Sequence, residues 1–164
     1  MSTMVIGIDP GMAATGYGLV SDMEDSLSCV AHGVIKTSAS QKHHERLQLI
    51  HRGLKEVIDM HSPQSAAVEK LFFSKNVSTA MAVGQCRGVA LLAMADRGLD
   101  VSEYTPGEIK QAVSGYGAAT KLQLQQMVQM LLELDEVPRP EHAADALAVA
   151  ICHAHSRKME MLLR

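Results

Sequence analysis

The sequence predicts an α/β fold with a mixed five-stranded sheet, three antiparallel strands first and parallel strands after them, flanked by helices. Two observations lead to this fold class. Three segments of β character separated by short turns reach position 37, and short apolar runs then alternate with segments of helical periodicity. With 164 residues, 47% of them hydrophobic, the chain suits one sizeable core, so we expect a single domain over residues 1–164.

The first hairpin carries the first candidate site residue. An uncharged run over residues 5–8 ends at Asp9, a Pro10-Gly11 turn follows, and residues 15–20 alternate small and large side chains as a returning strand does. Such an uncharged run is typical of a buried central strand. Asp9 is therefore either a site carboxylate at the end of that strand or an ordinary turn-initiating residue.

A third strand and the first helix follow the hairpin. Residues 28–37 carry β-branched side chains on both sides of Gly33, where we expect a bulge. Apolar residues then recur at helical spacing over residues 41–60, with Ser40 as the expected cap. Three histidines on or near this helix are either solvated or metal ligands: His43, His44 and His51.

A second apolar run, residues 65–69, also ends in a carboxylate, Glu69. Both phenylalanines of the chain, Phe72 and Phe73, come next and lie between Lys70 and Lys75. Aromatic rings between basic residues are typical of a loop that stacks on nucleic-acid bases, and the alternative is an anchor in the core.

The segment over residues 77–97 contains no charge before Arg87 and has Ala80, Gly84 and Gly88 four residues apart. Small residues at this spacing form one helical face that another backbone can approach closely. We expect this helix to lie against the sheet, and the alternative is a face for self-association.

The last strand is expected over residues 100–104, and two capping boxes follow it. Thr105 with Glu108 three residues later predicts a helix through Val113, and Thr120 with Gln123 predicts another to about Leu134.

The final helix begins at Glu141 and places His142 and Asp145 on one face, at i and i+3. Asp145 also suits a helix start through the macrodipole. Together with Asp9 and Glu69, these residues form a set of hard ligands that suits Mg²⁺ or Mn²⁺. Two such ions, ~4 Å apart, can activate water and stabilise a leaving oxygen, which is the chemistry of phosphodiester hydrolysis.

The net charge of −3 does not by itself favour nucleic-acid binding. If three of the 18 acidic residues form a metal site, however, the other 15 balance the 15 lysines and arginines. The three cysteines have no paired spacing and are expected to be reduced thiols. No apolar stretch approaches the ~20 residues of a membrane span, and no leader is apparent, so we expect a cytoplasmic protein without a membrane partner.

These motifs also carry a resemblance. Gly7-Ile-Asp-Pro-Gly11, Thr15-Gly-Tyr-Gly18, Val68-Glu69, Gly84-Gln-Cys-Arg-Gly-Val89 and Ala143-Ala-Asp-Ala-Leu-Ala148 resemble, in the same order, the RuvC family of Holliday junction resolvases. The resemblance implies an RNase H-like fold, a homodimer, and symmetrical paired nicks in four-way DNA junctions during recombination and repair. It also implies cytoplasmic action together with the RuvA and RuvB branch-migration complex.

By matching motif, the resemblance implies that Asp9, Glu69 and Asp145 are metal-binding catalytic acids. His142 stands where many members of the family have a fourth acid. A neutral imidazole removes one negative charge and suits Mn²⁺ better than Mg²⁺, so we predict activity favoured by Mn²⁺. His142 is then either a metal ligand or the base that activates water.

The resemblance also implies DNA contacts. Phe72 matches a residue that wedges against unstacked bases, with Phe73 and Lys75 in the same loop, while Lys110 and Lys121 match basic residues near the scissile phosphate. A lysine there offsets charge on the transferring phosphate. Lys121 also directly follows a helix cap, where any polar residue is tolerated.

Two other functions compete with this hypothesis. Gly-Ile-Asp-Pro-Gly also resembles the phosphate hairpin of actin-like ATPases and sugar kinases, but those proteins need a second copy of the motif and a longer chain. The other alternative is a non-catalytic junction-binding protein in which His142 marks decay of the site, and the intact acids and Lys121 argue against it.

Overall fold

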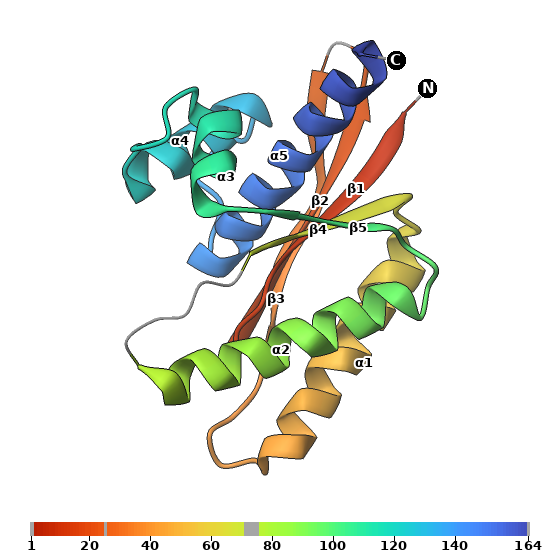
Figure 1. Ribbon diagram of the computed structural model, residues 1–164, viewed down its shortest axis with the longest axis vertical. Helices are drawn as coiled ribbons and strands as arrows, with labels where there is room; N and C mark the ends of the chain where they lie inside the picture. The colour runs from red at the N-terminus through yellow and green to blue at the C-terminus, as the bar shows by residue number, and fades with distance from the viewer. Residues whose placement is uncertain (1, 25, 71–75, 164) are drawn as a thin grey trace.

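A mixed five-stranded sheet divides the molecule into two helical layers (Figure 1). The computed structural model describes residues 2–24, 26–70 and 76–163. The strands are β1 (Thr3–Asp9), β2 (Ala14–Met23), β3 (Ser26–Lys36), β4 (Ser65–Glu69) and β5 (Val101–Tyr104). The helices are α1 (His43–His61), α2 (Val77–Ala95), α3 (Pro106–Ser114), α4 (Lys121–Leu131) and α5 (Glu141–Leu162).

The strand order is β3-β2-β1-β4-β5. The first three strands pair antiparallel, and β4 and β5 then add in parallel beside β1. The predicted mixed five-stranded sheet with flanking helices is therefore confirmed. Because parallel strands end at the same edge, the carboxyl ends of β1 and β4 lie next to each other.

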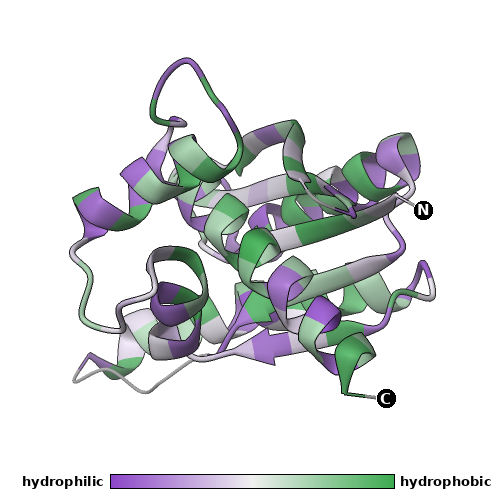
Figure 2. Cartoon of the chain, turned by 90° about the horizontal axis from the view of Figure 1, so that it is seen from above, coloured by the Kyte–Doolittle hydropathy of each residue, from purple (hydrophilic) through white to green (hydrophobic). Residues whose placement is uncertain are grey.

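Both faces of the sheet are covered, and β1 contributes to both cores. Ile6 and Ile8 pack with α1 and α2, whereas Val5 packs with α3, α4 and α5 on the other face. This division follows from the period of two along a strand. Figure 2 shows that the helices contain both hydrophobic and hydrophilic residues, as expected for helices that pack on the core with one side only.

Helix α5 lies directly on the backbone of β1 and β2, and two glycines make room for it. A Cβ at Gly7 would lie 2.2 Å from the carbonyl oxygen of Ala146, and one at Gly16 would lie 2.0 Å from that of His142. Neither distance is compatible with a side chain. The glycines therefore bring the first turn of α5 to the carboxyl end of β1.

Helix α2 covers the opposite face together with α1. Its buried residues include Cys86, Ala90 and Met94, whereas Met81 and Leu92 are exposed. By length and composition alone α2 is apolar enough to cross a membrane, so the expectation that no such stretch exists is wrong. Here one side of the helix packs on α1 and on the sheet core.

The small-residue face predicted for α2 is only partly buried. Ala80 is buried, but a Cβ at Gly88 would meet no atom within 4 Å. The helix therefore packs against its own core through a neighbouring face, and Gly88 lies on the side that this core leaves open.

Local features differ from the sequence expectations at three places. The register shift in the β2–β3 pair passes over Val30, not Gly33, and Gly33 lies instead against the ring of Tyr17. Helix α1 begins after Lys42, whose N–H donates to the Glu45 carboxylate, so Ser40 is not its cap. Helix α4 ends at Leu131, before the predicted end, because Glu133 adopts a positive φ.

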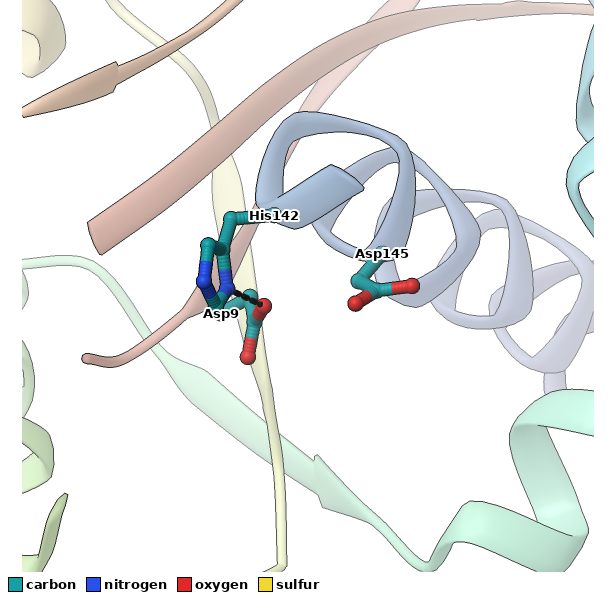
Figure 3. Close-up of side chains that lie close together, drawn as sticks. All are labelled: Asp9, His142 and Asp145. Atoms are coloured by element: carbon teal, nitrogen blue, oxygen red, sulfur yellow. Dashed lines mark hydrogen bonds and ion pairs between the residues drawn. The ribbon is translucent and has the colours of Figure 1, made fainter. Parts of the chain in front are cut away.

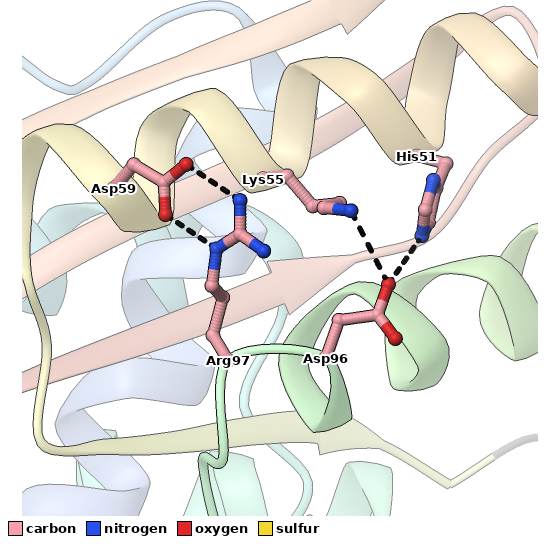
Figure 4. A network of polar contacts seen from close by, with 5 residues as sticks. All are labelled: His51, Lys55, Asp59, Asp96 and Arg97. Carbon is pink, nitrogen blue, oxygen red and sulfur yellow. Dashed lines mark hydrogen bonds and ion pairs between the residues drawn. The ribbon is translucent and has the colours of Figure 1, made fainter.

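Charged side chains join α1 to the end of α2 (Figure 4). His51 Nε2 lies 3.1 Å and Lys55 Nζ lies 3.4 Å from the same carboxylate oxygen of Asp96. Arg97 donates hydrogen bonds from Nε and Nη2 to the two carboxylate oxygens of Asp59. His51 thus has a carboxylate partner in this network, and His43 pairs with Gln85. Neither of these histidines belongs to a metal-ligand group within the described residues.

Candidate active site

Asp9 and Glu69 lie at the ends of adjacent parallel strands. The pairing of Ile8 with Val68 is the last in the β1–β4 ladder, and each carboxylate is the next residue along its strand. Because side chains alternate, Asp9 shares its face with Val5, and Glu69 shares its face with Ala67. Val5 and Ala67 both pack on the α5 side, so both carboxylates point to the face that α5 covers.

The first turn of α5 completes a compact group. The ligand atoms of Asp9, His142 and Asp145 all lie within 4.8 Å of one another (Figure 3). Nδ1 of His142 lies 2.8 Å from Oδ2 of Asp9. Two carboxylates and one imidazole are a donor set that divalent cations such as Mn²⁺ accept. The sequence prediction placed these three residues in one site, and the structure brings them together.

Glu69 lies beside this group but is not a member of it. It lines a cavity of about 260 Å³ together with Asp145, Lys110 and Lys121. It also borders a second depression with Asp9. Its carboxylate is therefore next to the three-residue group, in a position to hold a second ion or to add negative potential.

The electrostatics of the site fit a cation. Burial raises the pKa of Asp9, and the hydrogen bond from His142 opposes this only in part. Burial likewise raises the pKa of Glu69, and the charges of Asp9 and Asp145 raise it further. Burial also raises the pKa of Asp145 against the opposing charge of Lys121. Three carboxylates that repel one another in a partly desolvated place are stabilised by a bound divalent ion.

The two predicted lysines both reach this site. Nζ of Lys121 forms an ion pair with Glu141 and lies 3.4 Å from Oδ2 of Asp145. Burial lowers the pKa of Lys121, but the hydrogen bond with Glu141 and the charge of Asp145 outweigh it, so the net pKa is raised and the amine stays charged. Lys110 lines the same cavity.

The predicted DNA-contacting loop lies outside the described residues. This applies to three of the predicted residues: Phe72, Phe73 and Lys75.

Arg87 is a neighbour of the site to which the sequence analysis gave no role. Its Nη2 lies 2.6 Å from Oε1 of Glu103, its Nε donates to the backbone carbonyl of Glu69 at 3.5 Å, and it lines the depression beside Asp9. It thereby ties α2 to the carboxyl ends of β4 and β5. The signal was present in the sequence, because Arg87 is the lone charged residue between positions 77 and 95.

A family model described as crossover junction endodeoxyribonuclease RuvC matches residues 5–153. The chain belongs to the RuvC family. It is 53% identical over 153 residues to the crossover junction endodeoxyribonuclease RuvC of Heliobacterium modesticaldum, covering 93% of this chain and 94% of that relative. It is 46% identical over 160 residues to that of Natranaerobius thermophilus, covering 98% and 99%.

Solved RuvC structures agree with this assignment. A structure of Thermus thermophilus RuvC in complex with a Holliday junction substrate superposes with a TM-score of 0.92 at 38% identity, covering 96% of both chains. The yeast mitochondrial Holliday junction resolvase Ydc2 superposes with a TM-score of 0.72 at 13% identity, over 98% of this chain and 81% of that chain, which shows a shared fold.

The RuvC match confirms the predicted family, its resolvase fold and its enzyme class, crossover junction endodeoxyribonuclease. Because the RuvC match spans nearly the whole chain, the interpretation as a fragment of an actin-like ATPase or sugar kinase is dropped.

Proposed function

We propose that this RuvC family member resolves Holliday junctions by paired symmetrical nicks, through metal-dependent hydrolysis of phosphodiester bonds in DNA recombination and repair. One observation supports this most strongly: Asp9, His142 and Asp145 converge at the edge of the sheet in a chain of this family. Its substrate would be the four-way junction, as in the complex of the Thermus thermophilus relative.

Asp9, His142 and Asp145 would hold one divalent ion, and Glu69 with Asp9 a second. When bound, two Mg²⁺ or Mn²⁺ ions supply a water of lowered pKa and positive charge at the leaving oxygen. Lys121 stays protonated beside Asp145 and offsets negative charge on the transferring phosphate, and Lys110 acts in the same cavity.

Two roles are open to His142, and both use its Nε2. If Nδ1 carries the proton, it donates to Asp9, and the lone pair of Nε2 is then available as a metal ligand or as a base for water. An imidazole in place of a carboxylate lowers the negative charge of the site and favours Mn²⁺ over Mg²⁺.

We propose further that the active enzyme is a homodimer, because two equivalent cuts in a two-fold junction require two equivalent sites. The outer side of α2 supports this assignment: Met81 is 61% and Leu92 54% exposed, and a Cβ at Gly88 would meet no atom within 4 Å. Size-exclusion chromatography with light scattering should give twice the mass of the 17.7 kDa chain.

The remaining assignments also stay proposals. The DNA-contacting loop would contain Phe72, Phe73 and Lys75. The chain would act as one nuclease domain over residues 1–164, in the cytoplasm and together with the RuvA and RuvB complex. Three free cysteines support a reducing compartment: Cys29, Cys86 and Cys152.

A synthetic four-way junction labelled on each strand tests the activity. We expect nicks at symmetrical positions on two opposed strands in the presence of Mn²⁺ or Mg²⁺, and their loss in Asp9→Asn. Junction binding without metal-dependent nicking would instead support the non-catalytic alternative.

A further inference from the structure

Glu141 is a carboxylate at the rim of the candidate site for which the family motifs provide no role. It is the first residue of α5, directly before His142. Its Oε1 forms an ion pair with Nζ of Lys121, and the same ammonium lies 3.4 Å from Oδ2 of Asp145. Lys121 is therefore held between a carboxylate that belongs to the three-residue group and one that does not.

We propose that Glu141 is a positioning residue that holds the Lys121 ammonium at the rim of the site and so leaves Asp145 available to a divalent cation. This inference rests on the proposed function, in which Asp145 is a metal ligand. It deepens that function by assigning a role to a fourth carboxylate, one that acts through Lys121.

Competition for Asp145 provides the physical reason. An ammonium and a divalent cation repel each other strongly at contact distance, so an ion on Asp145 must push Lys121 away from that oxygen. Among the described residues, the ion pairs of Lys121 are those with Glu141 and Asp145. Without Glu141, the ammonium would have Asp145 alone and would compete harder with the metal.

Exposure indicates the direction in which Lys121 moves. The side chains of Lys121 and Glu141 are each 55% exposed, whereas Asp145 is only 24% exposed. The pair with Glu141 therefore lies on the solvent side of the site. An ammonium held there leaves the inner carboxylate free and still borders the cavity in which a phosphate would bind.

Two simpler roles would also make Glu141 useful. A carboxylate in the first turn of a helix stabilises that helix through its dipole, and any negative charge near a metal site attracts cations at a distance. Neither role depends on Lys121. A comparison of Glu141 variants with and without Lys121 therefore separates positioning from both.

The experiment measures Mn²⁺ binding to the purified full chain in the absence of DNA, from the loss of the free-ion electron paramagnetic resonance signal. Four proteins are compared with the wild type: Glu141→Gln, Lys121→Met, the double variant, and Glu136→Gln as a control. Glu136 is exposed and forms no ion pair within the described part of the chain. Circular dichroism checks that each variant is folded.

We expect Glu141→Gln to weaken Mn²⁺ binding by about two- to fivefold, the range that an exposed ion pair supplies. Lys121→Met should tighten binding, because it removes the competitor, and adding Glu141→Gln to it should change nothing further. Glu136→Gln should match the wild type. If Glu141→Gln unfolds the chain, Glu141→Asp, which shortens the carboxylate by one methylene, replaces it and should weaken binding less.

Equal weakening by Glu141→Gln in both backgrounds would overturn the positioning role, because charge alone would then explain it. No weakening by Glu141→Gln in the chain that retains Lys121 would overturn it as well. In either case the proposed function would stand if the wild type binds Mn²⁺ and nicks the junction. A wild type that binds no Mn²⁺ would refute the proposed function, and the inference with it.

Discussion

Acid should destabilise this protein through one buried histidine, His153 in α5. Its side chain is 4% exposed, its Nδ1 lies 2.8 Å from the hydroxyl of Tyr104, and its Nε2 lies 3.1 Å from Oγ of Ser65. Burial and the nearby charge of Arg157 lower the pKa of His153 to about 4, although Asp100 acts in the opposite direction. The imidazole is therefore neutral in the folded protein at neutral pH.

The sign of the effect follows from the two pKa values. In the unfolded chain the pKa of His153 returns to its ordinary 6.5, so the unfolded state binds more protons between pH 6.5 and 4. The free energy of unfolding must then decrease as the pH falls through this window. At ~1.4 kcal/mol per pKa unit, the total loss attributable to His153 is about 3 kcal/mol.

Urea denaturation followed by circular dichroism at a series of pH values between 7 and 4 measures this loss. His153→Gln keeps a polar side chain but cannot be protonated, so its stability should decrease less in acid than that of the wild type. The raised pKa values of Asp9, Glu69 and Asp145 make acid stabilising at those sites, but this contribution cancels in the difference between the two proteins.

His44→Gln changes an exposed histidine on α1 and controls for the substitution itself. Parallel pH curves for the wild type and His153→Gln would refute the reasoning, because the two states would then bind the same number of protons at this position.

Further predictions concern the active site and its support. His142→Ala should reduce junction cleavage by about 100-fold or more, because it removes a general base or a metal ligand. His142→Asp should keep the activity and shift its metal preference toward Mg²⁺. Unchanged cleavage by His142→Ala would exclude both roles. Gly16→Ala should lower the free energy of unfolding in a urea titration by about 1–3 kcal/mol and abolish nicking, because its Cβ would displace the start of α5. Gly107→Ala, whose Cβ would meet no atom closer than 4.0 Å, should do neither. Phe72→Ala should impair nicking more than junction binding, and a gel-shift titration that loses affinity in proportion to cleavage would contradict the wedge role.

Much of this architecture could be predicted from local patterns. The uncharged run before Asp9 and the shorter one before Glu69 predicted strands that end in acids, because alternation and turn residues act over a few positions. The capping boxes at Thr105 and Thr120 open α3 and α4 as predicted, with both reciprocal hydrogen bonds present. These features depend on neighbours in the chain, which a sequence displays directly.

Other features depend on packing between distant segments. The motif containing Gly7 was visible, but only the tertiary structure shows that this glycine admits the backbone of α5 and so brings His142 to Asp9. The sequence analysis gave no role to His153, yet it is buried and contacts Ser65 of β4 and Tyr104 of β5.

The sequence by itself determined which residues are the candidates for the chemistry, because residue type and position at a strand or helix end are local properties. The tertiary structure decided how these residues are arranged in space: Glu69 lies beside the three-residue group, and Lys121 lies between Asp145 and Glu141. Side-chain distances between remote segments depend on how closely a helix can approach a sheet. Close packing of the whole core determines that approach, and no local pattern records it.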